Sequence, residues 1–286
     1  MSAVTEDESE IEASRAPLLE HLVELRYRLV ICTAALAVGF IASFFVSQPI
    51  YELLARPLFL ATALTAEQKM QHGPFDLLLA VTGFKHVVAK PVLMQATEPL
   101  EFFFTKVKLA GFAAVVITFP VLAWQLYRFV APGLYKRERK AFLPFLIASP
   151  VLFAMGAAMV YFVMLPFVLW FSLSQNIQTA QLQVTLIPKV SAYLDLVTKL
   201  LLAFGLCFQL PVVVSLLGMA GLVSAKTLAG GRKYALVGIV VVACLVTPPD
   251  MVSPFLLSAP IYLLYEAAIL CVRLIERGRK TAGAST

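Results

Sequence analysis

Charged residues are scarce in this sequence. Only 14% of its 286 residues are charged and 60% are hydrophobic, whereas about a quarter of a typical water-soluble domain is charged. The mean hydropathy is +0.86. So few charges cannot cover a surface that faces water, and the composition therefore predicts an integral membrane protein. The net charge of +6 does not indicate a nucleic-acid partner, because the basic residues cluster between apolar stretches.

Cysteine and histidine are also scarce. Each of the four cysteines lies within an apolar run and no CxxC spacing occurs, so we expect small packing residues. The histidines form no spacing that would hold a metal. The sequence therefore predicts neither a metal nor a cofactor. These residues are Cys32, Cys207, Cys244 and Cys271, with His21, His72 and His86.

Catalytic motifs are missing as well. No GxxxxGK[ST] stretch offers a phosphate cradle, which excludes a P-loop ATPase. HExxH, GxSxG and an intramembrane cluster of His and Asp are absent, which argues against a membrane protease or lipase. No clear repeat relates the two halves, which weakens the interpretation as a secondary transporter. We therefore do not expect an enzyme.

The first residues do not form a secretory signal, which would need a positive start and an apolar run. Residues 1–16 are acidic and short of apolar bulk, so we expect an uncleaved, disordered tail. Residues 17–275 are expected to form a single transmembrane domain, and residues 276–286 a cytoplasmic tail.

Six segments are apolar enough to cross a bilayer as helices, which predicts an all-α polytopic membrane protein. Prolines interrupt several of them, and neighbouring helices must then satisfy the freed carbonyl groups. The segments are approximately Tyr27–Val46, Leu109–Tyr127, Phe142–Phe171, Leu196–Met219, Tyr234–Val246 and Phe255–Val272.

The distribution of Lys and Arg predicts the orientation. Fifteen of the 23 basic residues fall in the N-terminal region, the second loop, the fourth loop and the C-terminal region. Cytoplasmic segments carry such an excess, so both termini are expected in the cytoplasm. These residues are Arg15, Arg26, Arg28, Arg128, Lys136, Arg137, Arg139, Lys140, Lys226, Arg232, Lys233, Arg273, Arg277, Arg279 and Lys280.

The fifth segment is unusually short. Its 13 residues would extend about 20 Å, against a hydrocarbon core of about 30 Å. "TPPD" ends it, and Ser253–Pro254 is typical of the start of the next helix. The turn around Asp250 should therefore lie below the outer headgroups. Two short helices packed against longer neighbours, or a locally thinned membrane, both explain this.

Two carboxylates stand near the cytoplasmic face. Glu24 lies four residues before Arg28, so an internal ion pair is one interpretation. Glu138 lies among four cations in "YKRERK" and could simply balance them. Alternatively, both acids receive guanidinium groups in bidentate geometry.

Two polar residues fall within apolar segments. The amide of Gln209 needs a hydrogen-bonding partner, supplied either by a neighbouring helix or by a docked protein. Glu266, about two turns before Arg273, is a functional candidate because carboxylates are rare inside membranes. A structural pair with a neighbouring helix is the alternative for Glu266.

Several motifs together resemble the TatC family of the twin-arginine protein translocase, over about residues 18–275. They are "HLVELRYRL" (21–29), "PLEFFFTKVKLA" (99–110), "FVAPGLYKRERK" (129–140), "FGLCFQLPVVV" (204–214) and "TPPD" (247–250). Residues 66–92 resemble an insertion relative to shorter members.

The resemblance implies a cup-like arrangement of six helices in the bacterial inner membrane. It implies a receptor for signal peptides with consecutive arginines, which works with the single-span proteins TatA and TatB and with other TatC copies. Glu24 and Glu138 match the signal-binding carboxylates, and Arg26 and Phe129 the same cytoplasmic patch.

Two more positions match the family. Asp250 corresponds to the aspartate of the outer turn. Gln209 falls where some members carry glutamate, and its amide argues against a mechanism that titrates a proton there.

The function that this resemblance implies is transport of folded proteins, driven by the proton gradient. Two other functions stay open on the residues alone. A secondary transporter for a small solute is compatible with the interrupted helices, and a passive scaffold would need neither Glu24 nor Glu138.

Overall fold

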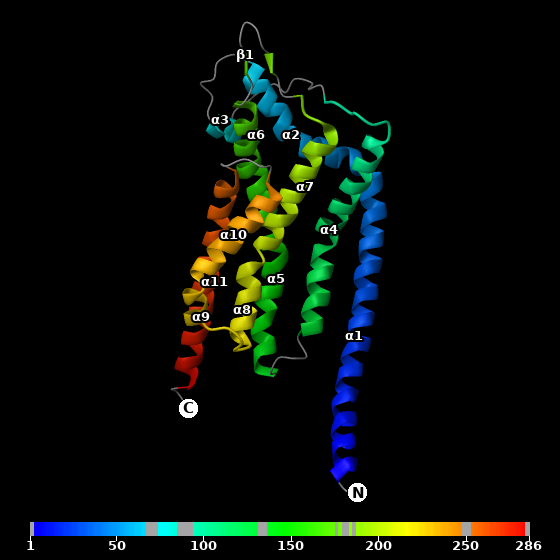
Figure 1. Ribbon diagram of the computed structural model, residues 1–286, viewed down its shortest axis with the longest axis vertical. Helices are drawn as coiled ribbons and strands as arrows, with labels where there is room; N and C mark the ends of the chain where they lie inside the picture. The colour runs from blue at the N-terminus through cyan, green and yellow to red at the C-terminus, as the bar shows by residue number, and fades with distance from the viewer. Residues whose placement is uncertain are drawn as a thin grey trace.

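The computed structural model shows a bundle of long helices (Figure 1). It describes residues 3–66, 74–84, 94–130, 136–174, 177–178, 183–184, 187–247 and 253–283, and for some of these, such as 3–21 and 136–146, only the backbone. Helices occupy all six predicted positions. They are α1 (Ala3–Phe45), α4 (Glu101–Val130), α5 (Lys136–Met159) with the π-helix η2 (Val160–Met164) and α6 (Leu165–Ser174), α7 (Val190–Cys207) with α8 (Leu210–Met219), α10 (Arg232–Val246) and α11 (Ser253–Gly283).

Among the described residues, five segments are long and apolar enough to cross a membrane. The sixth helix, α10, has 15 residues and extends about 22 Å at 1.5 Å per residue. The short fifth segment is therefore a feature of the structure. The five segments are Leu22–Phe45, Glu101–Phe129, Ile147–Ser174, Val190–Met219 and Ser253–Gly278.

Apolar side chains cover much of the outside of the bundle. Phe45, Leu245 and Leu263 are 84%, 80% and 69% exposed. Such side chains on the surface of long apolar helices fit a hydrocarbon surrounding rather than water. The chain is accordingly a multi-pass membrane protein.

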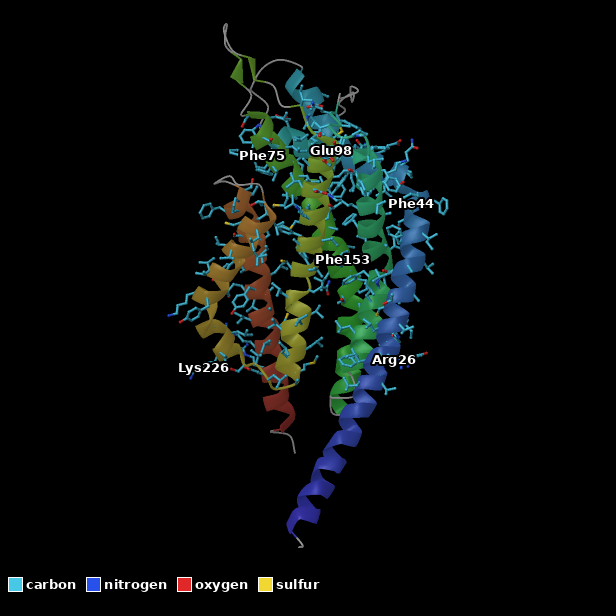
Figure 2. The ribbon with its side chains drawn as sticks, turned by 45° about the vertical axis from the view of Figure 1, so that its right-hand side comes forward. Arg26, Phe44, Phe75, Glu98, Phe153 and Lys226 are labelled. Atoms are coloured by element: carbon cyan, nitrogen blue, oxygen red, sulfur yellow. The ribbon has the colours of Figure 1, made fainter. Side chains whose placement is uncertain are left out.

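The two chain termini lie at the same end of the bundle, which we name the terminal end (Figure 1). The first residues of α5 and the connection from α8 to α9 (Ala225–Gly230) lie at this end too. Arg26 and Lys226 lie toward it, whereas Phe75 and Glu98 lie toward the opposite end (Figure 2).

At the far end, opposite the termini, the segment between the first two spans folds back as α2 (Ser47–Ala66) and α3 (Pro74–Val81). The sequence analysis assigned no helix there, and α2 contains Pro57. A two-stranded antiparallel ladder, β1 (Ile177–Gln178) with β2 (Gln183–Val184), lies at the same end.

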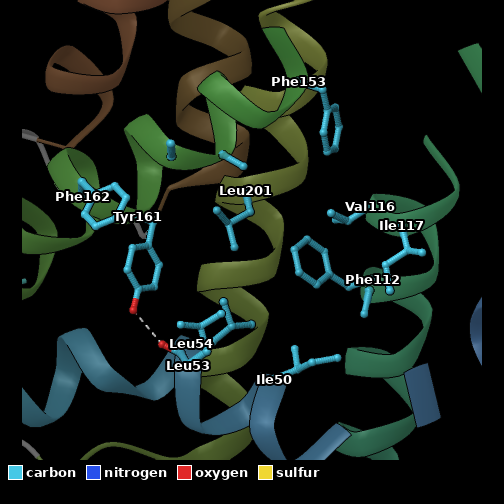
Figure 3. A pocket seen from close by; sticks show the side chains of 13 residues that line it. Ile50, Leu53, Leu54, Phe112, Val116, Ile117, Phe153, Tyr161, Phe162 and Leu201 are labelled. Carbon is cyan, nitrogen blue, oxygen red and sulfur yellow. Dashed lines mark hydrogen bonds between the residues drawn. The ribbon is translucent and has the colours of Figure 1, made fainter. Parts of the chain in front are cut away.

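Two tyrosines from different spans attach α2 to the bundle. The hydroxyl of Tyr161 donates to the carbonyl oxygen of Leu53 at 2.8 Å (Figure 3), and that of Tyr193 donates to Leu54 at 2.7 Å. Pro57 has no N–H, so the Leu53 carbonyl lacks its intrahelical donor. Tyr161 supplies the missing hydrogen bond.

Helices α1 and α4 pack closely along their length. A Cβ atom at Gly39 would lie 2.7 Å from the side chain of Thr118, and 3.5 Å from the backbone of Ala114. Only glycine permits this approach without a shift of the neighbour. The contact fixes the first span against the second and so positions the polar residues at their terminal ends.

Two features of the helices were not anticipated from the sequence, and one predicted residue lies outside the described part of the chain. Residues 3–16, where we expect a disordered tail, belong to α1, whose first turns are acidic and so complement the helix dipole. The fourth span is divided at Phe208–Gln209 into α7 and α8, because Pro211 cannot continue the hydrogen-bond ladder. Asp250 lies outside the described residues.

Candidate functional site

The terminal ends of α1 and α4 carry a polar network between Glu24, Arg28 and Gln125. The Arg28 Nε atom lies 3.2 Å from Glu24 Oε1, and Nη2 donates to the same oxygen. Arg28 Nη1 also reaches Gln125 Oε1 on α4 at 3.5 Å. The spacing of four residues places Glu24 and Arg28 on one helix face. The network therefore joins the first two spans.

The internal ion pair that the spacing of Glu24 and Arg28 allows is thus present. The side chain of Glu24 is 32% exposed and that of Arg28 15% exposed. Arg28 is the more buried partner, and Glu24 lies nearer the surface of the bundle. The carboxylate of Glu24 is therefore still accessible. Gln125 was missed by the sequence analysis, although an amide inside the apolar stretch "FPVLAWQLY" is a detectable signal.

Arg26 and Phe129, which the family resemblance assigns to the same patch, occupy different surroundings. Arg26 is exposed on α1. At about 100° per residue it lies opposite the face that carries Glu24 and Arg28. Phe129 is half-buried near the end of α4. The structure brings Glu24 together with Arg28 and Gln125 rather than with Arg26.

Glu138 is the third residue of α5, which begins at Lys136. Its backbone lies at the terminal end, on a span other than those of Glu24 and Phe129. Its side chain lies outside the described part of the chain. Its role in signal binding therefore stays a prediction.

Gln209 makes two hydrogen bonds with one residue of the third span. Its Nε2 atom donates to the carbonyl oxygen of Ser149 at 2.9 Å, and Ser149 Oγ donates to Gln209 Oε1 at 2.6 Å. Ser149 is buried, at 8% exposure. The amide thus joins the third span to the break in the fourth, as the helix-to-helix interpretation requires. Docking of a partner at Gln209 stays a prediction.

Glu266 pairs with Arg232 at the start of α10. Arg232 donates from Nε to Glu266 Oε1 at 2.7 Å and from Nη2 to Oε2 at 2.8 Å. The Tyr262 hydroxyl donates to Oε1 at 3.0 Å. This fork joins the last two spans, so the alternative of a structural pair with a neighbouring helix is the arrangement observed.

Two further bonds fasten the α9–α10 segment to α11. Tyr265 donates from its hydroxyl to the carbonyl oxygen of Leu228 at 2.8 Å, and Glu276 Oε1 accepts from the backbone N–H of Ala225 at 2.9 Å. Sequence reasoning had no means of pairing these residues. They make α9, α10 and α11 one unit at the terminal end.

The described residues contain no group of three or more His, Cys, Asp or Glu side chains that could hold a metal ion. The four cysteines are free thiols.

Another polar cluster, around Glu101, lies at the far end. The buried carboxylate of Glu101, 5% exposed, accepts from the backbone N–H of Thr97 at 2.7 Å and of Ser191 at 3.2 Å. Lys189 Nζ lies 3.6 Å from Oε2. Glu101 thus joins the segment before α4 to the segment before α7, a role that the sequence analysis did not foresee.

The sequence is similar to known proteins over most of its length. The family model described as Sec-independent protein translocase protein (TatC) matches residues 20–260. The TatC protein of Magnetococcus marinus is 39% identical over 265 residues, which cover 93% of this chain and 87% of that protein. The TatC protein of Escherichia coli K12 is 34% identical over 264 residues, which cover 92% and 91%.

A solved structure is similar as well. The crystal structure of a twin-arginine translocase receptor, TatC, matches with a TM-score of 0.70 and 32% identity. The match covers 89% of this chain and 98% of that one.

Proposed function

Because the chain belongs to the TatC family of Sec-independent protein translocase proteins, we propose that it is the receptor subunit of a twin-arginine translocase. Its relatives are named Sec-independent protein translocase protein TatC, and the similar crystal structure is that of a twin-arginine translocase receptor, TatC. We propose further that twin-arginine signal peptides bind at the terminal end of the bundle.

The observation that carries this proposal is the network of Glu24 with Arg28 and Gln125. A carboxylate has about four acceptor positions, so one guanidinium group does not exhaust it. Arg28 is more buried than Glu24 and orients the acid toward the rim. A second guanidinium from a signal peptide can then share the carboxylate, or compete with Arg28 for it.

The position of this end supports a cytoplasmic site. Both termini and the starts of α5 and α9 lie there, and these regions hold most of the basic residues. Cytoplasmic segments carry such an excess. We therefore place the terminal end on the cytoplasmic side of the bacterial inner membrane, where precursors are made.

The two acids cannot account for the whole affinity. A hydrogen bond to a charged group contributes about 1.5–3 kcal/mol, so two arginine–carboxylate pairs contribute about 3–6 kcal/mol. Micromolar binding needs about 8 kcal/mol beyond the cost of association. The apolar part of the signal must therefore contact the protein too, and Phe129 at the end of α4 is a suitable surface.

The cations around Glu138 have a place in this mechanism. They repel basic peptides in general, so that a single acid among them favours ligands able to form a close bidentate pair. Single-span partner proteins, TatA and TatB, and further TatC copies would complete the transport machinery. The proton gradient would supply its energy.

Site-specific crosslinking tests this function. A photoreactive phenylalanine derivative at position 129, which leaves Glu24 and Glu138 in place, should crosslink to a precursor whose signal carries two arginines, and much less to one with two lysines in their place. Equal crosslinking to both precursors would contradict the proposal. Solute uptake by the purified chain in liposomes would instead support a secondary transporter.

A further inference from the structure

A hollow of about 320 Å³ lies at the far end of the bundle, between the first turns of α2 and α4. This volume is at the lower end of the range of about 300–1,000 Å³ that small-ligand sites occupy. Leu109 and Leu194 line it and are almost fully buried, at 1% and 2% exposure. Gln48 and Glu52 line it and are exposed. The hollow therefore has an apolar floor and a polar rim.

The rim carries two opposite charges that do not pair with each other. Lys106 Nζ lies 5.0 Å from the centroid of the Phe102 ring, and Glu52 Oε1 accepts from Gln48 Nε2 at 3.3 Å. Neither Lys106 nor Glu52 forms an ion pair with another described residue. A cation and an anion that face one hollow at a distance suit a ligand that carries both charges.

The hollow lies at the level of a membrane surface. The candidate second span begins at Glu101, and the next three residues are phenylalanines that are each about half exposed. Tyr51, an amphipathic aromatic residue of the kind enriched at the headgroup level, also lines the hollow. Tyr51, across the hollow, makes an edge contact with Phe102 at 6.2 Å between ring centroids.

A second hollow, of about 420 Å³, follows further along α4 toward the terminal end (Figure 3). Its lining is apolar apart from the hydroxyl of Tyr161, which is bonded to Leu53. On α4, Lys106 and Leu109 of the first hollow are followed at helical spacing by Ala113 and Val116 of the second. The two hollows therefore lie on one stripe of α4.

The separation of the hollows matches half a bilayer. Lys106 and Val116 are ten residues apart, which is about 15 Å along a helix. Half of a hydrocarbon core of about 30 Å is also about 15 Å. A lipid whose headgroup lies at Lys106 would thus have its acyl chain beside the apolar hollow.

From this geometry we propose that the two hollows bind one phospholipid with an amine-bearing headgroup, such as phosphatidylethanolamine. Lys106 binds the phosphate, and Glu52 accepts hydrogen bonds from the ammonium group. One acyl chain extends from this rim toward the apolar hollow. The lipid supplies each charge on the rim with a partner.

The rim argues against two other occupants. Glu52 would repel a lipid that carries only negative charge, such as phosphatidylglycerol. An apolar helix of a single-span protein would fill the lower hollow but offer neither Lys106 nor Glu52 an opposite charge. The amine-bearing lipid satisfies both parts of the site.

Native mass spectrometry of the full chain in detergent, titrated with single lipids, tests the proposal. The wild-type protein should retain phosphatidylethanolamine more tightly than phosphatidylglycerol. Lys106→Gln should weaken the binding of both lipids about tenfold, since each lipid loses a charge-assisted hydrogen bond to its phosphate. Glu52→Gln should weaken the binding of phosphatidylethanolamine about tenfold. It should leave the binding of phosphatidylglycerol unchanged or make it tighter.

Two matched variants serve as controls. Lys108→Gln removes the same charge from the same helix, but Lys108 pairs with Asp195 at 3.1 Å and does not line the hollow. Glu98→Gln removes an exposed acid nearby. Neither should change lipid retention. Equal losses for Lys106→Gln and Lys108→Gln, or no lipid preference in the wild type, would overturn the proposal.

The apolar hollow that binds the acyl chain is tested separately. Val116→Trp should reduce lipid retention, with an unchanged melting temperature as the check of folding, while soluble phosphoethanolamine should bind only weakly to every variant. If phosphoethanolamine binds as tightly as the lipid, the ligand is a solute and the proposal fails. It also fails if these variants release a single-span partner but keep the lipid.

Discussion

The hydroxyl of Tyr161 and the carbonyl oxygen of Leu53 lie 2.8 Å apart, at the one carbonyl of α2 that Pro57 leaves without its helical donor. Tyr161 comes from the π-helix of the third span, 108 residues further along the chain. Replacement of Tyr161 by Phe would keep the ring and remove the donor.

We expect Tyr161→Phe to lower the free energy of unfolding by about 1–2 kcal/mol, because the Leu53 carbonyl then has no partner in an apolar surrounding. Thermal unfolding of the purified protein in detergent measures this. Tyr234→Phe is the control, since Tyr234 is 72% exposed, and should change nothing. A melting temperature unchanged in both would show that the Tyr161 hydroxyl contributes little, so that Tyr193 and apolar packing hold α2.

Glu138→Lys should impair binding of a twin-arginine precursor more than Glu138→Ala does. The lysine places a like charge against the incoming arginines, whereas alanine only removes an acceptor. Pull-down of the precursor by the detergent-purified protein compares the two. If both variants bind as well as the wild type, Glu138 merely balances its cationic neighbours.

Glu24→Gln should weaken binding of a twin-arginine signal peptide about tenfold or more, because a charge-assisted hydrogen bond becomes a neutral one. The peptide's affinity can be measured by fluorescence anisotropy. Glu98→Gln, the same change toward the far end, should have no effect. A passive scaffold would show equal affinity in all three proteins.

Gln209→Leu should lower stability by about 0.6–2 kcal/mol, the usual range for a hydrogen-bonded contact between membrane helices. Since Ser149 is its partner in both bonds, Ser149→Ala and the double variant complete a mutant cycle. Additive losses would exclude coupling between the two side chains. If Gln209 also docks a partner, co-purification of single-span proteins should fall while signal binding persists.

Exchange of the charges between Arg232 and Glu266 tests the fork between α10 and α11. Glu266→Arg alone should lower the melting temperature, because two guanidinium groups then face each other. Addition of Arg232→Glu should restore part of the loss. An absence of rescue would indicate that Tyr262, rather than Arg232, is the important partner of Glu266.

The spans could be predicted because long apolar runs require little beyond counting. The last helix begins at Ser253, as Ser253–Pro254 indicates. The helix α2 was not predicted, and it contains Pro57, a residue that usually ends or kinks a helix. Ser47 and Pro49 are nevertheless typical of a helix start.

The partners of the polar residues could not be predicted. Gln209 and Ser149 are 60 residues apart, and Arg232 and Glu266 are 34 apart. Nothing in one sequence states which helix faces which. The sequence could identify Gln209 and Glu266 as polar groups in need of partners, but only the packing of the helices shows what those partners are.

The π-helix Val160–Met164 divides the third span into two parts of different rotational phase. A π turn holds an additional residue, and one residue corresponds to a rotation of about 100°. The stripe that α5 turns toward its neighbours is therefore not the one that α6 presents. A deletion of one residue here would rotate α6 relative to α5 by about 100°. Tyr161 and Pro166 would then lose their present contacts, whereas Ser149 on α5 would keep its own.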